Sequence, residues 1–519
     1  MKNAIIFFCW LLYPFLLGAQ ESGPVGWASL NGGTSGGAGG DTVRIDSRSD
    51  LLFYTAATAP YVLLIEDTIR LNLYERVPVR GNKTLVGTGT GATVLNGGIE
   101  IKGNNVIVRN LRITGSYDGD WDGKTHSTDA ITVYGKNVWI DHCDLSASSD
   151  GLLDIRSDGS TPADYVTISW TRLSNHNKVM LFGSGDDEVV LRNHLRVTLH
   201  HCWFDGYPER GIHQRMPRVR FGDVHLLNNF FDDIASYCVA ARFESDLVVE
   251  NNYFRNSKHP HNIEDKGLGL EDPDLVAVGN IYDNCSGSRV SGGTAFRPGD
   301  FYTYTAEDPQ HLPARIMNGA GLLNDPNNLA PMAAVDELVL PAASNSSHTL
   351  DVLSNDTDPD GGELRLAALI RAPRGNARIL DNKLRYTSPF DIGKPDTLVY
   401  QLVDLQGGID TGLVVLHFGT LTAWQEAPPG FDLLVYPNPG RENISVEYHH
   451  PGGNRGISGM RLEVIDLQGR RQAVSADIRQ AGSGRSVFRL NTGSLRSGHY
   501  VVRITDGSYL LTQTITIVK

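Results

Sequence analysis

The sequence predicts an all-β protein, a right-handed parallel β-helix followed by two small β-sandwich domains. Three observations predict this fold class: an eight-residue frame that recurs before residue 330, a later change to short alternating strands, and 56 glycines, which indicate turns rather than long helices. At 519 residues the chain is too long for one ordinary compact domain.

Residues 1–19 have the pattern of a secretory signal peptide. The stretch "MKNAIIFFCWLLYPFLLGAQ" has one lysine, an apolar run and the small residue Ala19 near the expected cleavage point. No later run reaches the roughly 18 apolar residues that a transmembrane helix needs. The net charge of -13 argues against a general nucleic-acid binder. We therefore expect an exported protein with no transmembrane segment and no nucleic-acid partner.

The predicted β-helix spans residues 20–330. Seven β-rich frames begin at residues 106, 138, 166, 197, 224, 247 and 275. Short strands joined by loops of varying length stack as coils, with only the two ends of the stack needing a cover.

The sixth position of the frame supports this stack. In three successive coils it is an asparagine, which predicts an internal ladder of hydrogen-bonded amides at Asn229, Asn252 and Asn280. Cys143 and Cys202 hold the same position two coils apart, beyond disulfide reach, so we expect reduced core thiols.

The C-terminal part changes in character after residue 330. Residues 331–419 alternate apolar and polar residues between turn signals, which predicts a small antiparallel β-sandwich. Residues 420–430 are predicted to be a linker, and residues 431–519 a second β-sandwich.

Three aspartates lie in or beside the early coils: Asp129 in "HSTDAITV", and Asp150 and Asp154 in "SSDGLLDIR". In a straight strand the last two would lie about 13 Å apart, so only a bend at Gly151 would bring them together. Three carboxylates that converge without lysine partners repel one another, and a hard cation such as Ca²⁺ resolves that repulsion. From spacing alone, three solvated loop aspartates remain the alternative.

The stretch "GIHQRMPRVRFG" contains three arginines and no acidic residue, although the chain is acidic. Arg218 and Arg220 would share one face of an extended segment, whereas Arg215 would need the Pro217 region to reorient it. Guanidinium groups bind carboxylates in a bidentate manner, which favours an acidic polysaccharide over a merely solvated basic loop. Lys178 in "NHNKVMLFG" is, taken alone, a surface lysine.

Over most of residues 24–330 the sequence resembles the pectate lyase family of parallel β-helix polysaccharide lyases. The resemblance rests on motifs in order, "VIVRNLRI", "VWIDHCDLS", "SDGLLDIRSDGS", "DYVTISWTRLSNHNKVMLFGS", "LRVTLHHCWFD" and "QRMPRVRFGDVHLLNNFF". It implies a calcium site formed by Asp129, Asp150 and Asp154. It also implies that Arg215 is the Brønsted base, and that substrate carboxylate is held by Lys178 and Arg220. Asn177 departs from the aspartate that is frequent before this lysine.

The resemblance further implies anti β-elimination of α-1,4-linked polygalacturonate, which yields 4,5-unsaturated oligogalacturonides. Ca²⁺, Lys178 and Arg220 should disfavour the charged form of Arg215, so we expect an alkaline optimum. Two alternatives remain: a lyase of another uronan or of methylated pectin, and a non-catalytic glycan-binding β-helix adhesin.

The two C-terminal segments carry resemblances of their own. "NDTDPDG" resembles bacterial cadherin-like or immunoglobulin-like (Ig-like) modules, within residues 331–419. "YPNP", "VIDLQGR" and "SLRSGHYVVRI" resemble the type IX secretion sorting domain, within residues 431–519. This implies a monomer that the secretion machinery carries across the inner and outer membranes, for release or attachment at the cell surface.

Overall fold

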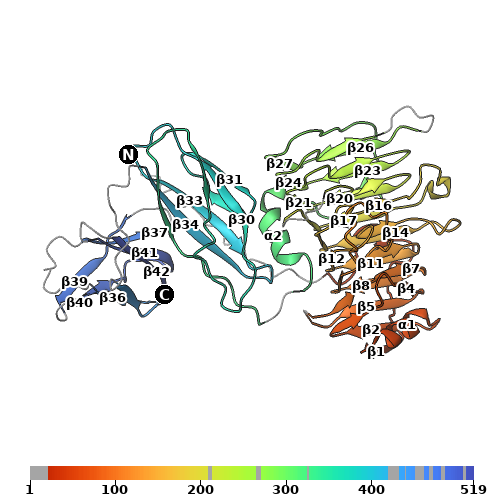
Figure 1. Cartoon of the computed structure of the whole chain (residues 1–519), viewed down its shortest axis with the longest axis horizontal. Helices are drawn as coiled ribbons and strands as arrows, with labels where there is room; N and C mark the ends of the chain where they lie inside the picture. The colour runs from red at the N-terminus through yellow and green to blue at the C-terminus, as the bar shows by residue number, and fades with distance from the viewer. Residues whose placement is uncertain are drawn as a thin grey trace, which may run out of the picture.

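The structure is a computed structural model of the chain. It describes residues 21–518 except 90, 208–212, 265–270, 324–326, 419–431, 439, 450–460, 467–470, 481–484 and 506–509. The predicted signal peptide and the predicted linker at 420–430 therefore lie outside the described residues. Along the chain, a long stack of coils is followed by two smaller sheet assemblies (Figure 1).

The coil stack consists of three parallel sheets, as expected for a parallel β-helix. The ten-stranded sheet has the order β1 (Asp41–Ile45), β2 (Tyr61–Ile65), β5 (Lys83–Gly87), β8 (Val106–Arg109), β11 (Lys136–Asp141), β14 (Asp164–Ser169), β17 (Val197–His200), β20 (Asp223–Leu227), β23 (Asp246–Glu250) and β26 (Asp274–Val278). The eight-stranded sheet has the order β4 (Arg76–Val79), β7 (Gly98–Ile101), β10 (Ile131–Val133), β13 (Leu153–Ile155), β16 (Leu181–Phe182), β19 (Arg218–Val219), β22 (Val239–Ala241) and β25 (His261–Ile263). The nine-stranded sheet has the order β3 (Thr68–Arg70), β6 (Thr93–Leu95), β9 (Arg112–Thr114), β12 (Asp144–Ser146), β15 (Arg172–Ser174), β18 (Trp203–Asp205), β21 (Phe230–Asp232), β24 (Tyr253–Arg255) and β27 (Ile281–Asp283).

Each of the seven predicted frames overlaps one strand of the ten-stranded sheet, from β8 to β26, and the frames stack in the predicted register. Val106 pairs with Val138, Val138 with Val166, and Val166 with Val197. All four valines are fully buried in the core of the coil stack. The prediction of a parallel β-helix is confirmed because the same inward position is apolar in each coil.

The asparagine ladder is also confirmed. The Nδ2 of Asn229 donates to Oδ1 of Asn252 at 3.0 Å, and the Nδ2 of Asn252 donates to Oδ1 of Asn280 at 3.0 Å. Cys143 and Cys202 are buried free thiols, as expected, and burial raises the pKa of each to about 12. Polar groups inside the stack are thus paired with one another or kept neutral.

Two helices interrupt the all-β pattern. Helix α1 (Arg48–Ala56) packs against β1 and β4 at the N-terminal end of the stack, where it buries Leu51 completely. Ser47 caps it by accepting a hydrogen bond from the backbone N–H of Asp50 at 3.1 Å. Helix α2 (Leu312–Gly319) follows the last coil. Helix α1 therefore covers the first coil, which would otherwise expose an unpaired apolar end.

The second part is a sandwich of two sheets. One has the order β28 (Asp336–Leu340), β34 (Ile409–Phe418), β33 (Asp396–Val403) and β30 (Arg365–Arg371). The other has the order β29 (Ser347–Leu350), β32 (Lys383–Thr387) and β31 (Asn376–Leu380).

This sandwich is docked on the nine-stranded sheet of the β-helix. Helix α2 lies between them (Figure 1), and one apolar cluster joins Trp203 and Phe230 of the β-helix to Ala367 and Val403 of the sandwich. In the same interface Arg365 is almost completely buried. Its Nη1 lies 3.5 Å from Oδ1 of Asp205, and Asp205 also accepts from Arg172 at 2.6 Å. The interface is therefore both apolar and ionic.

The third part contains two four-stranded sheets. Their orders are β35 (Asp432–Tyr436), β36 (Asn443–His449), β40 (Arg485–Asn491), β39 (Ser475–Gln480), and β38 (Arg471–Gln472), β37 (Arg461–Asp466), β41 (Gly498–Thr505), β42 (Leu510–Ile517). None of the helices in the described part of the chain is long and apolar enough to cross a membrane.

Candidate active site

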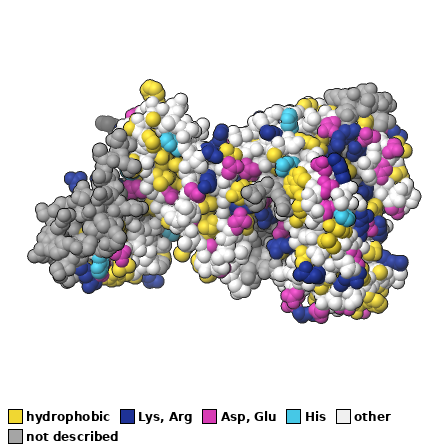
Figure 2. Space-filling model, viewed as in Figure 1, with side chains coloured by type: hydrophobic (Ala, Val, Ile, Leu, Met, Phe, Trp, Pro, Cys, Tyr) yellow, Lys and Arg dark blue, Asp and Glu magenta, His cyan; other side chains and the backbone are white. Residues whose placement is uncertain are grey.

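The predicted acidic and basic residues lie along one sheet of the β-helix, the eight-stranded sheet. Asp154 of β13 pairs with Thr132 of β10. An isolated bridge joins Gly151 to Lys178, and a second one joins Lys178 to Gln214. The acidic stretch, the lysine and the arginine stretch therefore occupy three successive coils, about 4.8 Å apart from one coil to the next. Figure 2 shows Lys and Arg side chains gathered beside Asp and Glu side chains on the β-helix.

Two of the three aspartates converge on the space above Gly151. A Cβ atom at Gly151 would lie 2.9 Å from Oδ1 of Asp129 and 2.8 Å from Oδ1 of Asp154. The Gly151 N–H also donates to Oδ1 of Asp129 at 2.8 Å. Burial raises the pKa of Asp129, and burial together with the Asp129 charge raises that of Asp154 well above its ordinary value. The backbone at Gly151 thus leaves room for two carboxylates that repel each other.

Cationic side chains accompany these carboxylates and offset their repulsion. The Nζ of Lys178 lies 3.4 Å from Oδ1 of Asp150, because the parallel coils stack Lys178 on Gly151. Arg156, which the sequence interpretation missed, lies with its Nη2 2.6 Å from Oδ2 of Asp129. Its position two residues after Asp154, directly past the end of β13, was the available signal.

The donor chemistry of this cluster suits a hard cation. In the described residues, no group of three or more His, Cys, Asp or Glu side chains is placed to hold a metal ion. The two oxygens above Gly151 nevertheless form a cradle that any side chain at this position would fill. Ca²⁺ prefers oxygen ligands, and it takes six to eight of them from carboxylates, carbonyl groups and water. The carboxylates of Asp129 and Asp154 fit Ca²⁺ when Asp150 turns away from Lys178 to join them, or when a bound ligand contributes further oxygen atoms.

The arginine stretch forms an ionic network on the same sheet. Arg218 contacts Glu264 at 2.8 Å, and Arg220 forms an ion pair with Asp186. Arg242, also missed by the sequence interpretation, reaches both carboxylates, at 3.0 Å to Asp186 and 3.3 Å to Glu264. Three guanidinium groups therefore share two carboxylates, which leaves an excess of positive charge.

Arg215 differs from its two neighbours in the stretch. Within the described residues it makes no ion pair with a carboxylate, and its buried Nε has no hydrogen-bond partner. Its backbone is left-handed (φ 65°), which breaks the side-to-side alternation that Arg218 and Arg220 follow. Arg215 is thus set apart from the network, and Arg210 lies outside the described residues.

Arg220 is largely buried. Its Nη1 donates to the Gly183 carbonyl at 3.1 Å, and its Nε faces Asp186. Burial lowers the pKa of Arg220, against the raising effect of Asp186. Only a limited part of its guanidinium can meet a ligand.

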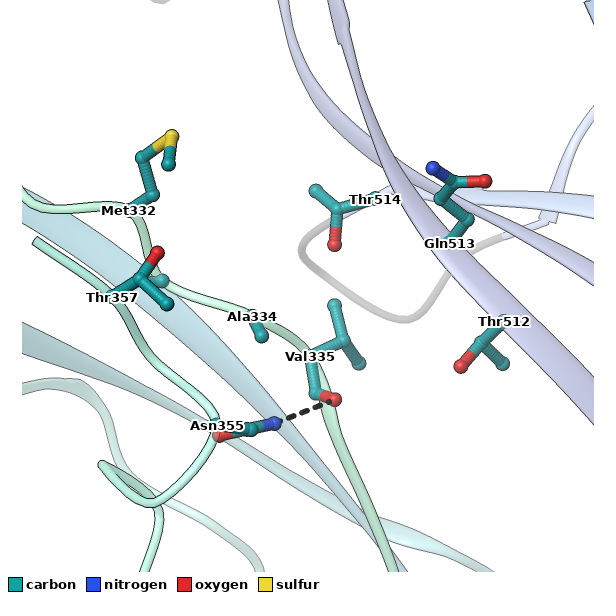
Figure 3. A pocket seen from close by; sticks show the side chains of 9 residues that line it. Met332, Ala334, Val335, Asn355, Thr357, Thr512, Gln513 and Thr514 are labelled. Atoms are coloured by element: carbon teal, nitrogen blue, oxygen red, sulfur yellow. Dashed lines mark hydrogen bonds between the residues drawn. The ribbon is translucent and has the colours of Figure 1, made fainter. Parts of the chain in front are cut away.

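Two pockets occur elsewhere on the molecule. One, of about 340 Å³, lies between the second and third parts of the chain and is lined by residues 332–335, 355, 357 and 512–514 (Figure 3). The other, of about 220 Å³, is lined by Arg112, Asp144, Arg172, Trp203, Ala320, Gly321, Leu322, Leu323, Leu405 and Gln406. None of the six predicted site residues lines either pocket.

Comparison with known families and proteins agrees with this picture. Residues 15–307 match the profile described as pectate lyase, residues 327–417 that of a bacterial Ig domain, and residues 434–519 that of a secretion system C-terminal sorting domain. The sorting domain marks the protein for secretion or for attachment at the cell surface.

Individual relatives were found by sequence and by structure. A pectate trisaccharide-lyase of Bacillus licheniformis is 34% identical over 252 residues, which cover 45% of this chain and 68% of the relative. A pectate trisaccharide-lyase of Thermotoga maritima is 38% identical over 218 residues, which cover 40% of this chain and 57% of the relative. A pectate lyase from Bacillus sp. N165, solved in complex with trigalacturonate, aligns with a TM-score of 0.48 and 26% identity over 58% of this chain and 99% of that chain. Because the pectate lyase profile spans more than half of its length, the chain belongs to the pectate lyase family and is a polysaccharide lyase.

Proposed function

We propose that the protein is a secreted, calcium-dependent pectate lyase that cleaves α-1,4-polygalacturonate by β-elimination. The observation that carries this proposal is the stacking of Gly151, Lys178 and Gln214 in three successive coils. This stacking places Lys178 against Asp150, at 3.4 Å, and sets Arg215 directly after the residue that pairs with Lys178. An acidic sugar bound at this position would lie beside protein carboxylates that can bind Ca²⁺. It would also lie beside cationic side chains that can bind the carboxylate of the sugar.

Asp129, Asp150 and Asp154 would hold the calcium ion. When bound, Ca²⁺ supplies positive charge that neutralises the uronate carboxylate and makes the C5 proton more acidic. Lys178, whose side chain is 17% exposed, would bind the same carboxylate once a calcium ion has taken its partner Asp150. Arg220 would add a contact through its Nη2, which makes no hydrogen bond within the described residues.

Arg215 would be the base. In the reaction its neutral guanidine takes the proton from C5, the bond from C4 to the glycosidic oxygen breaks, and a C4–C5 double bond forms. The leaving oxygen keeps the electron pair and takes a proton from water. A neutral guanidine is scarce at neutral pH, so we expect the rate to rise toward alkaline pH. Among the described residues Arg215 has no carboxylate partner, which supports this role because such a partner would stabilise the protonated form.

The test is the absorbance near 235 nm from unsaturated product, with polygalacturonate as substrate and with or without a chelator. The proposal expects product that requires Ca²⁺. Product from methylated pectin or another uronan alone would indicate a different lyase, and glycan binding without product would indicate an adhesin.

The assignment of the base has its own test. Arg215→Ala should reduce turnover by at least about a thousandfold, the upper range for a single proton-transfer group, and leave the unfolding midpoint within about two degrees. Arg218→Ala is the matched control, since Arg218 is already paired with Glu264. Retained turnover in Arg215→Ala would place the base elsewhere.

A further inference from the structure

The loop between β9 and β10, residues 115–130, lies against the candidate active site. A Cβ atom at Gly123 of this loop would lie 2.8 Å from Oδ1 of Asp150. The buried side chain of Asn177, which precedes Lys178, donates from Nδ2 to the Trp121 carbonyl at 2.8 Å. The loop therefore reaches from the coil of Asp129 to the coil of Lys178 and borders the row of ionic residues.

Asn177 fixes the loop at the level of Trp121. Its Nδ2 holds the Trp121 carbonyl, and its Oδ1 accepts from Nε2 of Gln214 at 3.1 Å. An amide can do both, whereas an ionised carboxylate has no N–H to donate. The position of Trp121 is thus tied to the coils that carry Lys178 and Arg215.

The indole of Trp121 is half-buried, and no ring in the described residues lies parallel to it. Tyr117 and His213 meet it edge-on, at interplanar angles of 85° and 78°, and His176 is tilted by 57°. Its N–H makes no hydrogen bond within the described residues. An indole of this kind offers an apolar surface and a donor to a flat ligand.

The charges around the indole are acidic. Asp118, Asp120 and Asp122 surround it in the sequence "DGDWDG". Asp122 pairs with Lys124 at 3.0 Å and Asp118 with Nδ1 of His126 at 2.7 Å, so three carboxylates face one lysine and one histidine in this loop. Backbone N–H groups, first that of Lys124, hold the pKa of Asp120 at about 2, so this carboxylate is charged at every working pH. A sugar that carries its own negative charge is repelled here, unlike at Lys178.

We propose that Trp121 forms a subsite, next to the charged site, for a galacturonate residue whose carboxyl group is methyl-esterified. The inference rests on the proposed lyase function. It specifies the substrate as a partially esterified chain in which the reacting galacturonate keeps a free carboxyl group. The C–H face of the pyranose ring stacks on the indole, and the ester avoids repulsion from Asp120 and Asp122. Asn177 is a positioning residue for this subsite.

The test compares polygalacturonate with partially methyl-esterified pectin at saturating Ca²⁺. For Trp121→Ala we expect KM to rise about tenfold on the esterified substrate, less than threefold on polygalacturonate, and kcat to stay within twofold on both. Trp121→Phe should restore most of the affinity because it keeps an aromatic face. Asp122→Asn, which removes an exposed charge, should lower KM on polygalacturonate about threefold and leave the esterified substrate unchanged.

Phe390→Ala and Asp391→Asn are matched controls, because both residues are exposed on the Ig-like domain, far along the chain from the loop. An equal loss on both substrates in Trp121→Ala, or no loss on either, would overturn the inference, as would an unchanged KM in Asp122→Asn. These results leave the lyase proposal standing. Absence of unsaturated product from the wild-type protein on both substrates would overturn the lyase proposal itself.

Discussion

The substitution Gly151→Ala tests whether the space between two aspartates is a calcium cradle. The added Cβ would lie 2.8 Å from Oδ1 of Asp154 and 2.9 Å from Oδ1 of Asp129, whereas ordinary contacts begin at 3.4 Å. Each oxygen must therefore withdraw by about half an ångström, more than the 0.2 Å or so that metal–ligand distances tolerate. We expect Ca²⁺ affinity to fall at least about tenfold.

The assay is calorimetric titration of the chelator-treated protein with Ca²⁺, together with the rate at 235 nm as a function of Ca²⁺ concentration. Gly151 is not in the left-handed region, so alanine itself is not strained there, and the metal-free protein should unfold at nearly the same temperature. Gly299→Ala is the matched control, because a Cβ at Gly299 meets nothing within 4 Å. Ca²⁺ affinity within twofold of wild type in Gly151→Ala would refute the cradle.

Three further predictions concern stability. Burial raises the pKa of Asp246 from 3.8 to about 7, so the folded state holds an extra proton and stability is lost as pH rises through that window; Asp246→Asn should raise the unfolding midpoint at pH 8 and leave it nearly unchanged at pH 3. Arg365→Ala should cost about 2 kcal/mol in urea unfolding, less than a fully broken buried pair, because Asp205 keeps Arg172. Asn252→Ala should cost about 3 kcal/mol, since it removes the buried amide that accepts from the N–H and Nδ2 of Asn229 and donates to Oδ1 of Asn280.

The predictions for Arg365 and Asn252 each have a control on the surface. For Arg365, the control Arg378→Ala removes an exposed arginine that contacts Asn284 across the rim of the interface between the β-helix and the sandwich. For Asn252, the control Asn284→Ala removes an exposed asparagine that is hydrogen-bonded to Asn256. Both should cost less than about 0.5 kcal/mol. Equal effects of buried and exposed changes would contradict the packing account, and a rise at both pH values in Asp246→Asn would contradict the titration account.

The β-helix was predictable because its core repeats. Each coil places an apolar residue at the same inward position, and Asn229, Asn252 and Asn280 repeat one polar position. Helix α1 was not predicted, because its apolar residues 51–54 are consecutive and lack the spacing of an amphipathic helix.

The sequence predicted which residues form the candidate site, but it did not predict which of them pair with one another. Asp150 and Lys178 are 28 residues apart, and their contact depends on the register between coils joined by loops of varying length. The same register pairs Arg220 with Asp186, 34 residues away. The spacing of residues along the sequence does not reveal this register. The sequence could therefore not show which cations lie beside the aspartates.

The docking of the Ig-like domain has a consequence for where the enzyme works. It occupies the nine-stranded sheet and leaves the eight-stranded sheet uncovered, while the sorting domain continues at the opposite end of the molecule (Figure 1). A molecule attached to a cell surface by its C-terminal end would therefore keep the candidate active site clear of the domain docked on the β-helix, so that a ligand could reach the site without displacing that domain.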